Sequence, residues 1–364
     1  MIVGLILCNL HGAWPYNYLI CYPLYIVKGL GLPAKTKYLL SIFLLLSVFS
    51  SGQDPQFSQF YANQLYLSPS FAGATEDYRL SLNWRNQWPS IPGVFHTYSV
   101  SFDKAVPNFN SGVGILATYD VAGSGDLSTT NIGLLYSYDI QLNDEWHIRP
   151  GVNFKFTYLG LDLTKLVWNS QITTGGTLPP ITPPPFDNVA DIDFAASALA
   201  YNEKIWAGFT VDHLLRPRTS FWGDNASIPV KVDLFGGFQI ISRGRLRKKL
   251  EEVLSVAANV MFQGDFFQSD IGFYYYKNPL VFGVWYRGIP FATTSDVSAQ
   301  AGDAIIGMIG IKTDQLNIGL SYDFTISNLI TASGGAYEIS LIYSFTASQI
   351  KRGQKIHAIP CPEF

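Results

Sequence analysis

The chain has 364 residues and a formal net charge of −3, with 14% charged and 15% aromatic residues. Soluble domains usually carry charge at about 25% of their positions, so we infer that something other than water covers much of this surface. A nucleic-acid partner normally requires a basic domain or stripe. The charge balance gives no support to a nucleic-acid-binding function.

The first feature along the chain is an apolar run from Tyr38 to Phe49, which follows Lys35 and Lys37 and precedes small residues at 50–52. This order of charged, apolar and small residues is typical of a secretory signal. The run is shorter than the roughly 20 residues of a transmembrane helix. An uncleaved anchor that uses upstream apolar residues is the alternative.

We therefore predict a cleavable signal peptide at 35–52 and a mature chain that begins at Gln53. Residues 1–34 form an apolar, aromatic preface that signals rarely carry, and we interpret them as a start site placed too far upstream. Beyond residue 52 the only cysteine is Cys361, so the exported part forms no internal disulfide and no thiolate metal site.

Residues 53–76 begin with the aromatic, turn-prone stretch QDPQFSQFYANQLYLSPSFAG. Phe57, Phe60 and Tyr61 have the spacing of one face of a short helical turn, and Pro69-Ser70 predicts a change of direction. Disordered segments usually contain few aromatic residues. We predict a periplasmic or lumenal segment that packs in or beneath the following domain as a plug or docking element, with a disordered leader as the alternative.

From residue 78 onward, apolar and polar residues alternate. In YRLSLNW, Tyr78 to Trp84, the even positions are apolar and the odd positions are Arg79, Ser81 and Asn83. This is the period of a strand with two different faces. The segments run to about 9–12 residues, which is the length of a transmembrane β-strand, whereas sandwich strands have about 5–6 residues.

We predict an all-β fold, a transmembrane antiparallel β-barrel of the outer-membrane type with about 14 strands over residues 77–347. A soluble all-β fold is the alternative. The polar faces carry Arg79, Arg85, Lys155, Lys231, Asp233 and Asp323, which suit a wet lumen. The predicted strands are Tyr78–Trp88, Phe95–Asp103, Gly112–Tyr119, Thr130–Ile140, Trp146–Tyr158, Ile192–Tyr201, Ile205–His213, Val230–Ile241, Val253–Phe262, Ser269–Tyr276, Leu280–Arg287, Ile305–Lys312, Leu316–Ile326 and Tyr337–Phe345.

The connections support this count, because outer-membrane barrels have short periplasmic turns and longer external loops. Connections after even strands are mostly short, and several after odd strands are long. The turns after strands two and eight, KAVPNFNS and SRGRLRKKLEEV, are longer than this rule predicts. Residues 348–364 then form a periplasmic tail.

Two connections offer candidate contacts. The proline-rich segment Leu178 to Pro185 is typical of a stiff extended loop, with an external docking site as the alternative. The turn after strand eight is a solvated turn with self-paired charges or a contact for an acidic periplasmic surface. Its basic residues are Arg243, Arg245, Arg247, Lys248 and Lys249.

The sequence contains no recognisable catalytic constellation. There is no G-x-S-x-G elbow and no obvious Ser, His and acid set. There is also no H-E-x-x-H, EF-hand loop or phosphate-binding loop. We therefore expect a non-enzymatic protein without catalytic, cofactor or metal sites.

Both ends of the mature chain resemble the PorP/SprF family of type IX secretion membrane proteins. The start carries a D-P-x-F-S-Q-aromatic stretch followed by Pro-aromatic-Ala-Gly, with Ser70 where the family usually has alanine, and the tail IHAIPCPEF has the family's Pro-Cys-Pro ending. We take the matching residues as candidates for partner docking. They are Asp54, Pro55, Phe57, Ser58, Gln59, Phe60, Pro69, Phe71, Gly73, Pro360, Cys361 and Pro362.

The resemblance implies an outer-membrane barrel, in contact with membrane lipid, that works with the type IX secretion and gliding machinery. It implies periplasmic and lipoprotein partners and the export or surface attachment of a cognate adhesin-type protein with a type IX sorting domain. It brings no catalytic residues. A passive porin or solute channel is the alternative function.

Overall fold

The computed structural model describes residues 54–75, 78–166, 184–245, 249–288, 303–326, 333–345 and 359–361. They belong to one compact unit, Gln53–Phe364. The expected extension at 1–34, the expected signal peptide at 35–52 and most of the proline-rich segment lie outside the described residues.

Antiparallel strands make up most of the described chain, as the alternating sequence pattern predicts. Short helical turns are α3 (Gln64–Leu67), η1 (Pro69–Phe71), η2 (Pro107–Phe109) and η3 (Leu163–Lys165). The strands are β1 (Tyr78–Gln87), β2 (Val94–Val106), β3 (Ser111–Gly123), β4 (Leu127–Tyr138), β5 (Ile140–Gln141), β6 (His147–Gly160), β7 (Asn188–Tyr201), β8 (Ile205–Asp212), β9 (Lys231–Arg245), β10 (Lys249–Gln263), β11 (Phe266–Lys277), β12 (Leu280–Arg287), β13 (Ala304–Lys312), β14 (Leu316–Thr325) and β15 (Ala336–Phe345).

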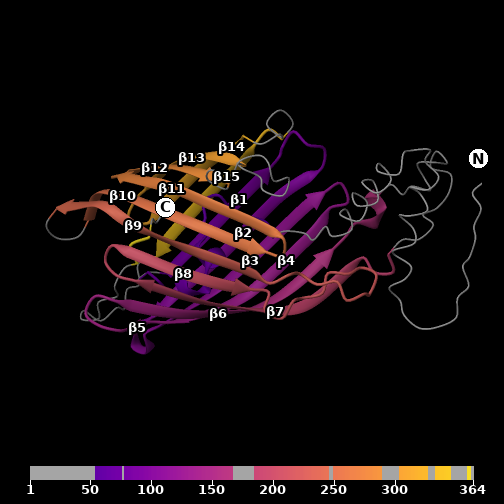
Figure 1. Ribbon diagram of the computed structural model, residues 1–364, viewed down its shortest axis with the longest axis horizontal. Coiled ribbons are helices and arrows are strands. Elements are labelled where there is room, and N and C mark those ends of the chain that lie inside the picture. Colours follow the sequence, from indigo (N-terminus) through magenta and orange to yellow (C-terminus); the bar gives the residue numbers. More distant parts are fainter. Residues whose placement is uncertain are drawn as a thin grey trace, which may run out of the picture. The chain divides into compact units, whose positions relative to one another are not determined.

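The strands form a closed barrel (Figure 1). Consecutive strands are paired, except that β4 pairs with β6 and not with β5, and β1 pairs with β15. Of the fifteen strands among the described residues, the two-residue β5 pairs only with β6, so the other fourteen form the wall. This confirms the predicted antiparallel barrel of about 14 strands. Closure leaves the wall without a free edge strand.

Side chains alternate between the two faces of the wall. In β6 the burial alternates strictly, with Arg149 and Asn153 buried and Phe154 exposed. Large apolar side chains cover the outside, including Leu134 at 60% exposed and Val284 at 60% exposed. The polar residues of the alternating pattern therefore face the lumen, and the apolar residues face outward. No helix of the described residues is long and apolar enough to cross a membrane.

The barrel has two different ends. We call the end that holds the start of β1, the end of β15 and the connections at 107–110, 202–204 and 278–279 the turn end. The opposite end, which includes the long connections at 161–187, 213–230 and 288–303, is the loop end. Three loop-end connections are short, at 88–93, 124–126 and 264–265.

The two turns that looked too long are shorter in the structure. Strand β2 continues to Val106 and β9 continues to Arg245, because the backbone keeps pairing with β3 and β10 past the point where the sequence alternation fades. A register shift between Leu250 and Glu252 accompanies this extension of the second hairpin. Both turn-end connections therefore follow the rule for outer-membrane barrels.

Candidate functional site

Residues 54–75, which we call the lumenal segment, lie inside the barrel. Tyr61, Phe71 and Ser58 are completely buried, and Phe57 is 4% exposed. Hydrogen bonds or ring contacts join the segment to strands all around the wall, namely β1, β2, β4, β6, β7, β8, β9, β10, β11, β12, β14 and β15.

The segment runs from the loop end to the turn end. Asp54 contacts His213 after β8, Lys231 at the start of β9 and Gln263 at the end of β10. All three lie at the loop end. Gly73 donates its backbone amide to Asp103 near the end of β2, at the turn end, over 2.8 Å.

Asp54 is held by a cluster of charges at the loop end. Its Oδ2 lies 2.8 Å from His213 Nε2 and 3.3 Å from Lys231 Nζ, and its backbone amide donates to Gln263 Oε1 over 3.0 Å. The other ring nitrogen of His213 lies 2.7 Å from Asp193 Oδ2. Both ring nitrogens of His213 therefore contact a carboxylate oxygen.

This cluster does not fit a metal ion, although Asp54, Asp212 and His213 place one ligand atom each within 4.8 Å of one another. A metal ligand needs a free lone pair on the imidazole. The ring nitrogens of His213 face carboxylates, and Lys231 supplies a positive charge beside Asp54. The described geometry is that of an ion-pair cluster.

The cluster predicts a pH-dependent attachment of the lumenal segment. Burial alone would lower the pKa of His213, but Asp54 and Asp193 outweigh it and raise the pKa to about 9. Burial alone would raise the pKa of Asp54, but His213 and Lys231 hold it well below its usual range. His213 stabilises the attached segment fully below about pH 6.5, and this stabilisation is lost as the pH rises through about 9. The stabilisation by the Asp54 carboxylate is lost only in acid.

We expect limited proteolysis to reach residues 54–61 above roughly pH 10 and not at neutral pH. His213→Gln should remove this transition, because the amide does not titrate, and His96→Gln on β2 should leave it unchanged. A transition near pH 9 that persists in His213→Gln would contradict the assignment.

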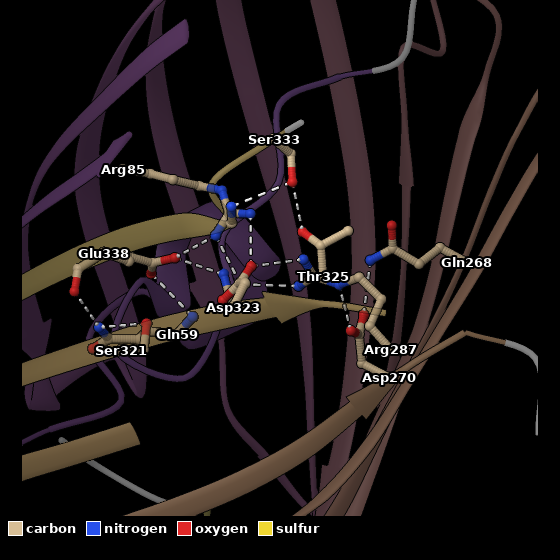
Figure 2. A network of polar contacts seen from close by, with 12 residues as sticks. Gln59, Arg85, Gln268, Asp270, Arg287, Ser321, Asp323, Thr325, Ser333 and Glu338 are labelled. Carbon is tan, nitrogen blue, oxygen red and sulfur yellow. Dashed lines mark hydrogen bonds and ion pairs between the residues drawn. The ribbon is translucent and has the colours of Figure 1, made fainter. Parts of the chain in front are cut away.

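Ser58 and Gln59 are held by a second network of buried charges, and Figure 2 shows Gln59, Asp323 and Glu338 of this network. Glu338 on β15 accepts the backbone amide of Ser58 over 2.7 Å and that of Gln59 over 3.0 Å. The Ser58 hydroxyl donates to Asp323 Oδ2 over 2.7 Å and accepts from Arg85 Nη1 over 2.8 Å. The Gln59 side chain donates to the Ser321 hydroxyl and accepts from the Ser340 hydroxyl.

The charges of this second network are paired with each other. Asp323 lies between Arg85 and Arg287, at 2.8 and 3.2 Å (Figure 2). Arg85 also pairs with Glu338, and Arg287 pairs with Asp270. Buried charges need such partners because an unpaired charge costs several kcal/mol. The network therefore positions Ser58 among buried charges that all have oppositely charged partners.

Aromatic rings pack around the middle of the segment. The Phe60 ring meets Trp285 edge to face at 4.6 Å, and the Trp206 indole donates to the Tyr61 hydroxyl over 2.9 Å. Phe57 instead packs against Tyr66 at 5.2 Å. The three aromatic residues do not share the predicted helical face, because the helical turn begins later, at α3. Tertiary contacts with the wall override the local spacing.

The second part of the segment is held through its backbone. Arg149 donates to the carbonyl oxygens of Ser70 over 3.1 Å and of Ala72 over 2.7 Å. The Ser70 hydroxyl lies 2.6 Å from the Ser197 hydroxyl. Serine therefore makes a hydrogen bond here that the alanine usual in the family could not make. Gly73 has a left-handed φ of +61°, which favours glycine.

The other candidate residues lie at or near the turn end. Pro360 and Cys361 are buried, the Gln239 side chain donates to the Pro360 carbonyl over 2.9 Å, and Gln64 donates to Cys361 Sγ over 3.3 Å. Arg243 pairs with Glu252 at 3.3 Å and is largely exposed. Arg245 ends β9 and Lys249 begins β10, whereas Arg247, Lys248 and Pro362 lie outside the described residues.

Several residues of the site were not singled out from the sequence. Glu338, Arg287 and Arg149 supply contacts to the lumenal segment from β15, β12 and β6. Each is a charged residue at an inward position of an alternating strand. A charged residue on the polar face of an alternating segment is therefore the sequence signal that would have identified these three residues.

A closed barrel with an apolar outside and a polar, occupied inside is a membrane barrel of the outer-membrane type. Solved outer-membrane barrels are similar in fold. They include the Pseudomonas putida toluene transporter TodX (12% identity, TM-score 0.40, 80% of this chain and 94% of that chain), a Pseudomonas aeruginosa FadL homologue (14%, 0.41, 77% and 94%) and the KdgM porin (7%, 0.36, 74% and 99%). These similarities are too low to transfer any function.

The sequence profile of the type IX secretion system membrane protein PorP/SprF family matches residues 49–343. The chain belongs to this family, as its two terminal motifs indicated. Among curated protein sequences, none matches the chain.

Proposed function

We propose that this chain is a non-enzymatic barrel of the type IX secretion machinery that supports export or surface attachment of a cognate adhesin-type protein and does not conduct solutes. The observation that carries the proposal is the lumenal segment, because its residues from Phe57 to Ala74 are all buried except the partly buried Tyr66, and it contacts strands all around the wall. A passive channel needs a continuous water path at this place.

The proposed partners lie on both sides of the membrane. The secreted protein would dock at the loop end. Periplasmic or lipoprotein subunits would dock at the turn end, where the tail returns to the barrel through Pro360 and Cys361. The basic hairpin from Arg243 to Lys249 would contact an acidic periplasmic surface of a partner. Electrostatic attraction would then set the association rate and the orientation of the bound partner.

The test combines purification with conductance. The full chain, tagged in the connection between β12 and β13, is purified from outer membranes and then placed in planar bilayers. Recovery of a large secreted protein or of machinery subunits, with no steady current, is the expected result. A pure barrel with steady ion conductance would overturn the proposal in favour of a solute channel.

A further inference from the structure

The wall binds the outer half of the lumenal segment, residues 54–61, as a receptor binds a peptide. Glu338 accepts two successive backbone amides, from Ser58 and Gln59, and Gln263 accepts that of Asp54. The wall also contacts each of these three side chains with polar groups. Backbone contacts give affinity and side-chain contacts give specificity in peptide recognition.

The two halves of the segment are attached in different ways. Side chains of the wall hold the outer half, with polar groups around Asp54, Ser58 and Gln59 and aromatic rings around Phe60 and Tyr61, and they could equally hold another chain with the same groups. The inner half, residues 64–74, is locked by backbone packing, since a Cβ on Gly112 would lie 1.9 Å from the Ala72 carbonyl oxygen. The outer half can therefore leave its site while the inner half still fills the turn end.

The direction of the bound chain limits what could replace it. The segment enters at the loop end with Asp54 and runs inward toward the turn end, so its carboxyl side lies deeper than its amino side. Another chain bound in the same direction enters from the loop end with its carboxyl end first. Its folded part then stays outside, on its amino side.

The charges of the site also limit the incoming sequence. His213 and Lys231 sit where the acidic side chain of Asp54 binds. Deeper in, Arg85, Asp323 and Glu338 bind a hydroxyl group and two amides. A fitting tail has an acidic residue near the loop end and a hydroxyl residue four positions later.

We propose that the loop-end half of the lumen is a peptide-binding site that takes the carboxy-terminal tail of another polypeptide in place of residues 54–61. The partner lies on the loop side, and its tail displaces the protein's own segment. The inference rests on the proposed function only in that the partner would be a secreted protein. The peptide site itself is tested without secretion.

The experiment uses the full chain with a released segment. Ser58→Pro together with Gln59→Pro removes the two amide donors that Glu338 accepts, because proline has no N–H. The probe is a labelled synthetic peptide, QDPQFSQFYA with an amidated carboxyl end, and binding to the barrel in detergent is measured by fluorescence anisotropy. A heat-dependent shift on gels shows that the barrel is folded. If the double-proline chain fails this check, Asp54→Ala with Ser58→Ala and Gln59→Ala replaces it.

We expect the released variant to bind the peptide about tenfold more tightly than the wild type, whose site is already filled. Adding Glu338→Gln should weaken this binding by about tenfold, because one charged acceptor of two amides is lost. Glu252→Gln, at the turn end of β10, is the matched control and should change nothing. A peptide with both proline replacements should not bind.

The direction of binding gives the sharpest test. The peptide fused through its amino end to a soluble carrier protein should bind as the free peptide does. The same carrier on the carboxyl end should abolish binding, because the carrier cannot enter the lumen. Absence of peptide binding to a folded released variant, equal binding of both fusions, or no effect of Glu338→Gln would overturn the proposal, whether or not partners are recovered in vivo.

Discussion

A barrel without residues 53–73 is expected to conduct ions steadily, whereas the complete chain is not. The deletion removes the contacts of Ser58 with Arg85, of Phe60 with Trp285 and of Phe71 with Phe235. It leaves charged side chains such as Arg85 and Lys155 in a water-filled lumen. The pairing of β1 with β15 and the lipid-facing side chains are unchanged. We therefore expect a folded, heat-modifiable barrel with a steady single-channel current in planar bilayers.

The same deletion is expected to abolish the recovery of the periplasmic or lipoprotein subunits, which are the partners proposed for the turn end. Val284→Ala, a change at an exposed side chain on the outside of β12, serves as the control and should alter neither readout. A folded deletion variant with no current would mean that another part of the chain closes the lumen. Unchanged partner recovery would refute docking through this segment.

Gly112→Ala is expected to displace the inner half of the lumenal segment. A Cβ on Gly112 would lie 1.9 Å from the Ala72 carbonyl oxygen and 2.8 Å from Gly73 Cα, so backbone must move. Overpacking costs about 1–3 kcal/mol even where side chains can adjust, and a clash with backbone costs at least as much. We expect a free energy of unfolding in denaturant that is lowered by that amount, or a folded barrel whose segment is accessible to protease.

Gly307→Ala on β13 is the matched control, because its nearest contact would be Phe324 at an ordinary 3.7 Å. We expect a change within about 0.5 kcal/mol for this variant. Equal behaviour of the two alanine variants would show that the close approach of Ala72 to β3 does not hold the segment.

Strand positions could be predicted from the sequence because the two faces of the wall meet different surroundings. Lipid on one side and a polar lumen on the other impose a period of two on every strand, so Leu82 and Asn83 fall on opposite faces in the sequence and in the structure. Strand ends were less predictable. Residues such as Lys104 and Arg245 extend β2 and β9 because backbone pairing with the next strand continues without a sequence signal.

The partners of the lumenal segment could not be read in this way. Ser58 binds Glu338 across 280 positions of sequence, and Asp54 binds His213 across 159. Nothing in the local pattern of either partner indicates the other. Phe57 shows the same limit, since its spacing suggested a helical face shared with Phe60 and it packs against Tyr66 instead.

The sequence by itself determined the membrane barrel, its number of strands, the orientation of their faces and the family, because alternation and the terminal motifs are local properties of the chain. Only the tertiary structure decided what fills the lumen. Closure of the wall brings inward-facing charges from distant strands to one place, and there Arg85, Asp323 and Glu338 meet Ser58. The pairing of these charges in a buried site is a property of the closed barrel and of no single stretch of sequence.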